Sequence, residues 1–386
     1  MAQSVALAVD LGASGGRVLA GGFDGRRLDL AEIHRFENAP VPLGGELVWD
    51  LVRLWQEVLV GLRSAAVRHG LAVSSVGVDT WGVDFSFLSA DDALVANPVC
   101  YRDARTSGML AAAERIVPRE EIFAATGLQF MEINSLYQLL ALRRKHPSLL
   151  DAADRFLMIP DLFHWLLSGE RSNECTNATT SQCFDPRRQA WALDMLDRFG
   201  IPRRLFGPTI GPGTDLGPLR PDVASETGLS GVRVVAPGTH DTASAVAAVP
   251  ASEKPTDEPE WCYVSLGTWA LVGVERSTPL VTSACLERNF TNEGGVGGTT
   301  RLLKNVCGLW LVQQCRAHWR RAGQEHSWEE LTSLSAAAPA LGTIIDPDDP
   351  SLVAPADMPE AIRRLAAAAG DPVPATVGAV IRTALE

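Results

Sequence analysis

Residues 4–23, SVALAVDLGASGGRVLAGGF, contain two β-rich runs separated by a short stretch of small residues. The first run covers 4–12 and the second covers 16–23, with glycines between them where a chain can turn. A third β-rich run, 27–36, follows an Asp-Gly pair. We therefore expect the chain to begin with three strands, the first two joined by a Gly-rich turn.

Helical signals follow these strands. Asp50 can cap an amphipathic stretch that ends at Gly70. Strand character returns at 73–89 around a turn-like Thr-Trp-Gly. Further helices are predicted at 135–146 (ended by Pro147), 161–168 and 191–199. This order of elements predicts a mixed α/β fold and not an alternating barrel.

The second half repeats the opening pattern. After an acidic, Pro-containing stretch at 250–260, residues 261–275 again read as strand, Gly turn, strand. A chain of 386 residues also exceeds the ~250–300 at which one core stops growing. We predict two related domains, 1–248 and 249–386. The end, 374–386, starts an amphipathic helix without a C-terminal cap, so we expect an incomplete second domain.

Composition excludes several classes of protein. A net charge of −12 argues against nucleic acid or an anionic membrane as the main partner. The seven cysteines form no Cys-x-x-Cys pair, and no apolar run approaches the ~18 residues of a membrane span. These features predict reduced thiols in a soluble, cytoplasmic protein.

The turn at Ala13–Arg17 can bind an anion. Glycines permit positive φ and close approach of the backbone, while Ser14 and Arg17 add a hydroxyl and a positive charge. Taken alone, the motif fits a simple Gly-rich hairpin better than an anion site. The second copy, 265–273, raises the possibility of two hairpins holding a polyphosphate across a cleft. Asp10 precedes the turn and can hold Mg²⁺ through water, or instead bond its own turn.

The string GTHDTASAV, 238–246, places Asp241 where a helix is expected to begin. Thr239 or Asp241 can act as its N-cap. A carboxylate there is stabilised in its charged form by the helix dipole. An ionised Asp can accept the proton of a hydroxyl that attacks a γ-phosphate, so Asp241 is a candidate general base.

Two further strings have polar residues with suitable spacing. In DTWGVDF, 79–85, Trp can stack on a sugar and Gly82 lets a ligand reach the backbone, although a buried strand with a turn is the alternative. We predict one helix over 303–319, with Asn305 near its start and Gln313 about 12 Å further along the axis. Surface polar residues are the alternative there.

These motifs together resemble the FGGY family of carbohydrate kinases, and within it the members that act on L-rhamnulose. Strings that match occur in family order across nearly the whole chain: VDLGASGGRV, IHRF, VGVDTWGVDF, YRDART, INSLYQL, GTHDTASAV, SLGTWALVG, NEGGVGG, LKNVCGLWLVQ and DMPEAI.

The resemblance implies a two-domain, actin-like (ribonuclease-H-like) fold and ATP-dependent phosphorylation of L-rhamnulose at its 1-hydroxyl. L-fuculose or another ketose is the alternative substrate. A sugar-binding remnant without activity and an actin-like ATPase acting on protein are the alternative functions. The implied partners are the sugar, ATP and Mg²⁺, with no nucleic acid or membrane, in a monomer or homodimer.

The resemblance also implies roles for individual residues. Asp241 matches the catalytic base, and Asp10 a metal-associated acid. The sugar-contacting positions are Gly82, His240, Thr242 and Asn305. The nucleotide-contacting positions are Ala13, Ser14, Gly15, Gly16, Arg17, Thr268 and Gln313. The matching strings also contain His34, Arg102, Asp103 and Asn134, for which the resemblance provides no role.

Overall fold

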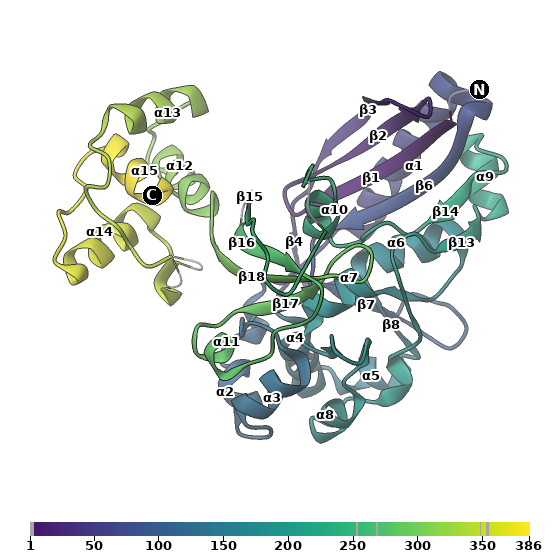
Figure 1. Ribbon diagram of the computed structural model, residues 1–386, viewed down its shortest axis with the longest axis horizontal. Helices are drawn as coiled ribbons and strands as arrows, with labels where there is room; N and C mark the ends of the chain where they lie inside the picture. The colour runs from purple at the N-terminus through teal and green to yellow at the C-terminus, as the bar shows by residue number, and fades with distance from the viewer. Residues whose placement is uncertain (1–3, 252–253, 268, 348, 353–354) are drawn as a thin grey trace. The chain divides into compact units, whose positions relative to one another are not determined.

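The computed structural model describes residues 4–251, 254–267, 269–347, 349–352 and 355–386 (Figure 1). The chain forms two compact units. Unit 1 consists of Met1–Glu260 and Glu275–Leu302, and unit 2 of Trp261–Val274 and Leu303–Glu386. The chain passes from one unit to the other after Glu260 and again within strands β16 (Trp269–Arg276) and β18 (Thr300–Cys307).

Unit 1 is built on a six-stranded sheet in the order β13-β14-β6-β1-β2-β3 (Figure 1). Its strands are β1 (Ser4–Gly12), β2 (Gly15–Phe23), β3 (Leu28–Glu37), β6 (Val73–Thr80), β13 (Asp215–Pro218) and β14 (Arg233–Val235). β1, β2 and β3 are antiparallel, whereas β1, β6 and β14 run parallel. The three strands predicted at the start of the chain are confirmed.

Helix α1 (Leu51–His69) packs on this sheet because both surfaces are apolar. Alternate residues of β1 are buried, as a strand with one covered face requires. On α1, Leu54, Val58 and Leu62 are buried at helical spacing. A Cβ at Gly61 would collide with Val18 of β2, so glycine permits this close approach. The helix begins and ends at the predicted caps, Asp50 and Gly70.

A second core of unit 1 is rich in aromatic rings, including Phe85, Phe87, Phe156 and Trp191. It lies around the antiparallel pair β7 (Phe85–Leu88) and β8 (Arg155–Met158). The helices of this region are α2 (Met109–Glu114), α3 (Arg119–Thr126), α4 (Ser135–Lys145), α5 (Pro147–Ala152) and α8 (Leu193–Arg198), whereas α6 (Ile159–Ser168) packs its apolar residues into the core of the main sheet. The predicted helices at 135–146, 161–168 and 191–199 are therefore present with small shifts in their ends.

Short elements complete unit 1. They are β4 (Val41–Leu43), β5 (Glu46–Val48), β9 (Asn173–Glu174), β10 (Phe184–Asp185), β11 (Ala190–Trp191), β12 (Thr209–Ile210), β17 (Thr291–Gly294), α7 (Cys175–Ala178), α9 (Pro221–Thr227), α10 (Asp241–Ala247) and α11 (Ser283–Glu287).

Unit 2 contains the hairpin of β15 (Tyr263–Leu266) and β16, followed by four helices. The helices are α12 (Trp310–Arg321), α13 (Trp328–Ala337), α14 (Met358–Ala369) and α15 (Val377–Leu385). Their apolar faces share a core that includes Leu311, Cys315, Ile362 and Ile381. The predicted strand-turn-strand pattern of 261–275 is confirmed.

The single helix predicted over 303–319 is wrong. Strand β18 extends to Cys307, and α12 begins only at Trp310. A Cβ at Gly308 would lie 2.7 Å from the backbone of Trp269 and Ala270, so the chain packs tightly where it turns from strand to helix. Asn305 is therefore on a strand and Gln313 on a helix, and the 12 Å helical spacing does not apply.

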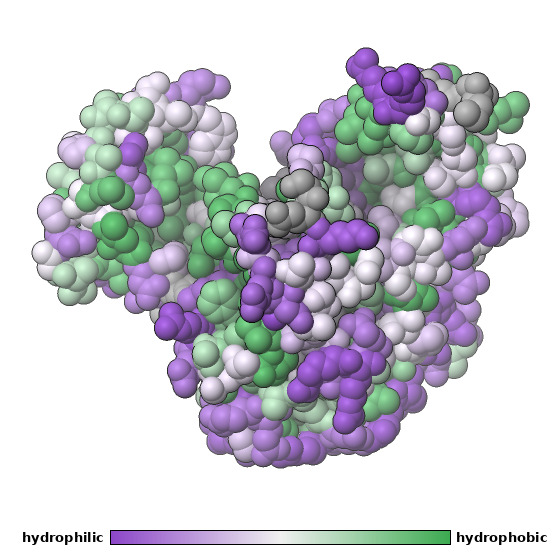
Figure 2. Space-filling model, in the orientation of Figure 1, coloured by the Kyte–Doolittle hydropathy of each residue, from purple (hydrophilic) through white to green (hydrophobic). Residues whose placement is uncertain are grey.

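The surface, the cysteines and the helices can be compared with the predictions made from composition. Figure 2 shows mostly hydrophilic side chains over the part of unit 1 that carries α3 and α8. All seven cysteines are free thiols. Within the described part of the chain, no helix has both the length and the apolar character needed to cross a bilayer.

Candidate active site

Three carboxylates from distant parts of the chain come together at one edge of the main sheet. The parallel register of β1 and β6 sets Asp10 opposite Asp79 near the ends of both strands. The next residue of β6, Thr80, forms a parallel bridge with His240. Asp241 follows immediately. Strand pairing therefore brings both the predicted base and the acid predicted to associate with metal close to Asp79.

One cation lies within this acidic cluster. Arg17, opposite Asp10 in the hairpin register, places its Nε and Nη2 2.8 and 2.7 Å from Oδ2 of Asp10. Removal from water raises the pKa of Asp79 well above its ordinary value. The charges of Asp10 and Asp241 raise it further, and Arg17 opposes them. These four side chains form one electrostatic cluster.

Asp241 is held by one carboxylate oxygen. Its Oδ1 accepts from Thr242 N at 2.6 Å and from Thr242 Oγ1 at 3.2 Å, and it lies 3.4 Å from His240 Nε2. The side chain is 39% exposed. Asp241 is the first residue of α10, and His240 occupies the N-cap position without a capping side-chain bond. The suggestion that Thr239 or Asp241 caps the helix is therefore wrong.

The backbone before Asp241 is anchored by a buried acid that sequence reasoning missed. Glu174 is fully buried, and its Oε2 accepts from Thr239 N at 2.9 Å and from Thr239 Oγ1 at 2.8 Å. Its Oε1 accepts from Thr176 N at 2.9 Å. Thr239 thus uses its side chain on Glu174, which explains why it does not cap α10. No local pattern around 174 indicates this long-range contact.

The loop that contains Gly82 is fixed by its neighbours. A Cβ at Gly82 would lie 2.9 Å from Thr180 Oγ1, so packing against Thr180 alone accounts for glycine there. The next residue, Val83, adopts φ 66°, a conformation that β-branched residues rarely adopt. Val83 N donates to Thr180 Oγ1 at 3.0 Å, and Val83 O accepts from Ser135 Oγ at 2.5 Å. These bonds keep the loop in its strained shape.

The buried carboxylate of Asp84 anchors the same loop by hydrogen bonds. Its carboxylate accepts from Trp49 Nε1 at 2.7 Å, Trp81 Nε1 at 3.0 Å, Gln138 Nε2 at 2.9 Å and Tyr101 N at 3.2 Å. Burial raises the pKa of Asp84 to about 6, although the four hydrogen bonds lower it. The Trp81 indole is therefore committed to Asp84.

The predicted phosphate turn, Ala13–Arg17, joins β1 to β2. Asn38 holds it by donating Nδ2 to Gly12 O at 2.9 Å and its N to Ser14 O at 3.3 Å. Gly16 is required because a Cβ there would collide with the Phe36 ring. The glycines of this turn do not have positive φ, so the expectation based on φ is wrong and close packing is the reason for Gly16.

Unit 2 carries the remaining predicted residues. Leu309 N donates to Gly267 O at 2.9 Å, which ties the hairpin of β15 and β16 to the start of α12. Gln313 lies on the first turns of that helix, and Asn305 lies on β18. Thr268 lies outside the described residues.

The four residues without a predicted role make contacts that hold unit 1 together. His34 pairs with Glu57 at 2.6 Å, Arg102 lies over the Tyr101 ring, Asp103 accepts from Leu47 N at 2.7 Å, and Asn134 donates to Gln182 Oε1 at 3.0 Å.

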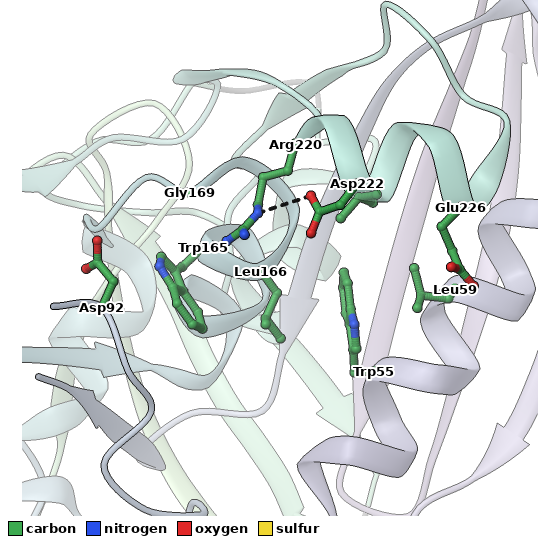
Figure 3. A pocket seen from close by; sticks show the side chains of 10 residues that line it. Trp55, Leu59, Asp92, Trp165, Leu166, Gly169, Arg220, Asp222 and Glu226 are labelled. Carbon is green, nitrogen blue, oxygen red and sulfur yellow. Dashed lines mark hydrogen bonds and ion pairs between the residues drawn. The ribbon is translucent and has the colours of Figure 1, made fainter.

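A separate pocket of about 580 Å³ in unit 1 contains none of the predicted site residues (Figure 3). Trp55 and Trp165 line it, from α1 and α6. Arg220 donates to Asp222 at 3.3 Å at its rim. The acidic cluster therefore remains the better candidate for the active site.

Both parts of the chain match domains of one known protein family. Residues 5–248 match the N-terminal domain of the FGGY family of carbohydrate kinases, and residues 262–386 match its C-terminal domain.

Individual relatives agree. A rhamnulokinase of Bacteroides thetaiotaomicron is 41% identical over 98% of this chain and 76% of its own length. A rhamnulokinase of Oceanobacillus iheyensis is 40% identical over 94% of this chain and 74% of its own. The crystal structure of a ligand-bound xylulose kinase from Lactobacillus acidophilus is 14% identical and covers 99% of this chain and 75% of its own, with a TM-score of 0.76. At 14% identity, this similarity shows that the two chains share a fold and no more.

Ionisation of Asp84 should lower the stability of the folded protein as the pH rises from about 4 to 6. Its pKa is raised from 3.8 to about 6 on folding, so the folded protein holds this proton where the unfolded chain has lost it. A shift of about two units corresponds to about 3 kcal/mol. We expect urea unfolding to show that the stability advantage of the wild type over Asp84→Asn shrinks by about 3 kcal/mol across this window.

Asp222→Asn is the matched control, since this exposed carboxylate pairs with Arg220 at the surface. Its stability should follow that of the wild type across the same pH range. Parallel curves for Asp84→Asn and the wild type would contradict the raised pKa of Asp84.

Proposed function

Because this chain belongs to the FGGY family of carbohydrate kinases, we propose that it transfers the γ-phosphoryl group of ATP to the 1-hydroxyl of L-rhamnulose. The sugar is the substrate indicated by relatives about 40% identical over most of the chain. ATP is the co-substrate, and its use favours a cytoplasmic location.

The arrangement of Asp241 is the observation that carries this proposal. One oxygen, Oδ1, is engaged by Thr242, while no hydrogen bond to Oδ2 is made by the described residues. The side chain is partly exposed, so a hydroxyl can reach Oδ2. A general base needs this combination of a fixed carboxylate and a free oxygen.

The reaction is an in-line displacement at phosphorus. As the sugar oxygen forms its bond to the γ-phosphorus, the bond from that phosphorus to the β,γ-bridging oxygen breaks and ADP leaves. The proton of the sugar hydroxyl moves to Oδ2 of Asp241. Because such a transition state needs positioning and charge stabilisation above all, the groups around Asp241 act mainly by holding the reactants.

Unit 1 would supply most contacts to the sugar. Gly82 lies on the loop that Asp84 holds from inside the protein, His240 directly follows Thr239, which Glu174 holds, and Thr242 is in the first turn of α10. We assign Asn305 of unit 2 to the same substrate. The rigidity of these loops favours selection of one sugar, since small changes in a fixed pocket redirect specificity.

Nucleotide contacts are assigned to both hairpin turns. In unit 1 they comprise the backbone of Ala13–Gly16 and the guanidinium of Arg17. In unit 2 they comprise Thr268 and Gln313. The contact of Gly267 with Leu309 supports the second assignment, because it joins the residue preceding Thr268 to the helix that carries Gln313.

Asp10 fits a magnesium ion. Its carboxylate offers the hard oxygen ligand that Mg²⁺ prefers, and it is partly exposed. Mg²⁺ usually keeps several waters and is held by one or two carboxylates together with substrate phosphates, so a single protein carboxylate is a sufficient ligand. When bound, Mg²⁺ would neutralise phosphate charge. Arg17, now paired with Asp10, provides a second positive charge at that place.

Ketose specificity is the first test of the proposal. With ATP and Mg²⁺ present, ADP release should be fastest with L-rhamnulose and slower with L-fuculose, D-xylulose and glycerol at equal concentration. Faster turnover with another ketose would transfer the assignment to that sugar, and ADP release that no sugar stimulates would refute the kinase.

Replacement of Asp241 tests the catalytic step. Asp241→Asn keeps an oxygen that accepts from Thr242 but removes the base, so kcat should fall by about 10²-fold or more. Binding of L-rhamnulose, measured by calorimetry, should remain. Asp222→Asn, which removes a surface carboxylate from another part of unit 1, should retain wild-type kcat. An unchanged kcat in Asp241→Asn would exclude this residue as the base.

Replacement of Gly308 tests the nucleotide assignment in unit 2. The added Cβ of Gly308→Ala would lie 2.7 Å from the backbone beside Thr268 and force a shift there. The KM for ATP should rise about tenfold, equivalent to ~1.4 kcal/mol, and more than the KM for the sugar. Gly211→Ala, where the added Cβ meets open space, should change neither value. An equal rise in both KM values would contradict the assignment.

A further inference from the structure

The imidazole of His240 contacts two buried charged groups in unit 1. Arg301 is fully buried, and its Nη2 lies 2.9 Å from His240 Nδ1. Glu293 is 4% exposed, and its Oε2 lies 3.3 Å from the same nitrogen and 3.2 Å from Arg301 Nη2. One ring nitrogen of His240 therefore faces both a cation and an anion.

The hydrogen-bonding chemistry of arginine decides which form of the ring fits. A guanidinium has donors and no acceptor, and it stays protonated in proteins. The two hydrogens of Arg301 Nη2 can serve His240 Nδ1 and Glu293 Oε2 together. Nδ1 must then be the acceptor, so the ring proton is on Nε2. A proton on Nδ1 would place two donors 2.9 Å apart, and only the longer contact, to Glu293 Oε2 at 3.3 Å, could accept it.

The position of Nε2 connects this choice with the proposed base. His240 Nε2 lies 3.4 Å from Oδ1 of Asp241, the oxygen that Thr242 already engages. A hydrogen on Nε2 therefore attracts Oδ1 and leaves Oδ2 for the sugar hydroxyl. With the proton on Nδ1 instead, the lone pair of Nε2 would repel Oδ1.

Arg301 is rigid enough to impose this choice. Its Nε donates to Gly294 O at 2.9 Å, and its Nη2 is committed to His240 and Glu293. Its Nη1 is buried without a hydrogen-bond partner among the described residues. An unsatisfied buried donor lowers stability, so stability alone does not explain an arginine at this position.

We propose that Arg301 is a positioning residue that fixes His240 as the Nε2-protonated tautomer and thereby orients the Asp241 carboxylate. The proposal rests on the proposed role of Asp241 as general base. Arg301 touches no substrate and acts through His240. The chain of contacts runs from the buried guanidinium through the imidazole to Oδ1.

Nitrogen NMR of the full chain tests the tautomer directly. In protein labelled with ¹⁵N-histidine at neutral pH, His240 should show a protonated Nε2 and an unprotonated Nδ1. His240→Gln identifies the resonances among the seven histidines by their loss. A proton on Nδ1 of His240 in the wild type would overturn the proposal, and this readout needs neither sugar nor activity.

Two variants separate the roles of the cation and the anion. Arg301→Met removes the donor and leaves Glu293 beside Nδ1, so the ring should gain a proton there and kcat should fall about tenfold or more. Glu293→Gln keeps the donor, so the Nε2-protonated tautomer should persist. An unchanged tautomer in Arg301→Met, or a change of tautomer in Glu293→Gln with Arg301 present, would refute the proposal.

Arg204→Met is the matched control for loss of a guanidinium. Arg204 donates to backbone oxygens of Leu150 and Ala153 in another part of unit 1, so its loss should leave the His240 resonances and kcat unchanged. If Arg301→Met does not fold, the wild-type spectrum and Glu293→Gln still decide the proposal. Failure of Asp241 as the base would be seen separately, as undiminished kcat in Asp241→Asn.

Discussion

The parallel pairing of β1 with β6 is the constraint on which the candidate site depends. It sets Asp10 beside Asp79, and the bridge from Thr80 to His240 extends the same register to Asp241. Side chains alternate along a strand, so a slip of one residue would turn Asp10 toward the core that Val9 and Leu11 fill. Burial of the apolar face therefore also fixes the position of the acids.

Gathering acids at one edge has an electrostatic consequence. Like charges repel strongly where protein replaces water, and the raised pKa of Asp79 reflects this repulsion together with burial. Arg17 offsets part of it through Asp10, and Thr242 donates to Asp241. A bound Mg²⁺ would offset part of this negative charge, and Arg17 would be available to the phosphates of a nucleotide.

Sequence patterns were most informative where structure is local. The turn at 13–17, the caps of α1 and the second hairpin depend on neighbours in the chain, and each was predictable. The stretch 303–319 was misassigned because its apolar residues suit a strand or a helix. Gly308 lies where β18 ends and α12 begins, and it packs closely against Ala270. That contact joins residues far apart in the sequence, so the local pattern could not indicate it.

The supporting residues of the site were hidden for the same reason. Glu174 and Arg301 belong to no motif that spacing could identify, and each acts on a segment far away in the sequence. Asp241 could be proposed as the base from the sequence because its string combines an acid with small residues at a helix start, and the structure has it as the first residue of α10. The role of a functional group is thus easier to infer from sequence than the identity of the groups that hold it.

The residues beside Asp241 are small, which helps to explain why its supports are charged. Thr239 and Ala243 are buried, but such short side chains offer little apolar surface that packing could use to fix the loop. Directional bonds can do so instead: Glu174 binds Thr239 through two donors, and Arg301 binds the ring of His240. Apolar replacements for buried charges often match them in stability. They would not, however, specify where a donor points, and the proton transfer that we propose for Asp241 depends on that orientation.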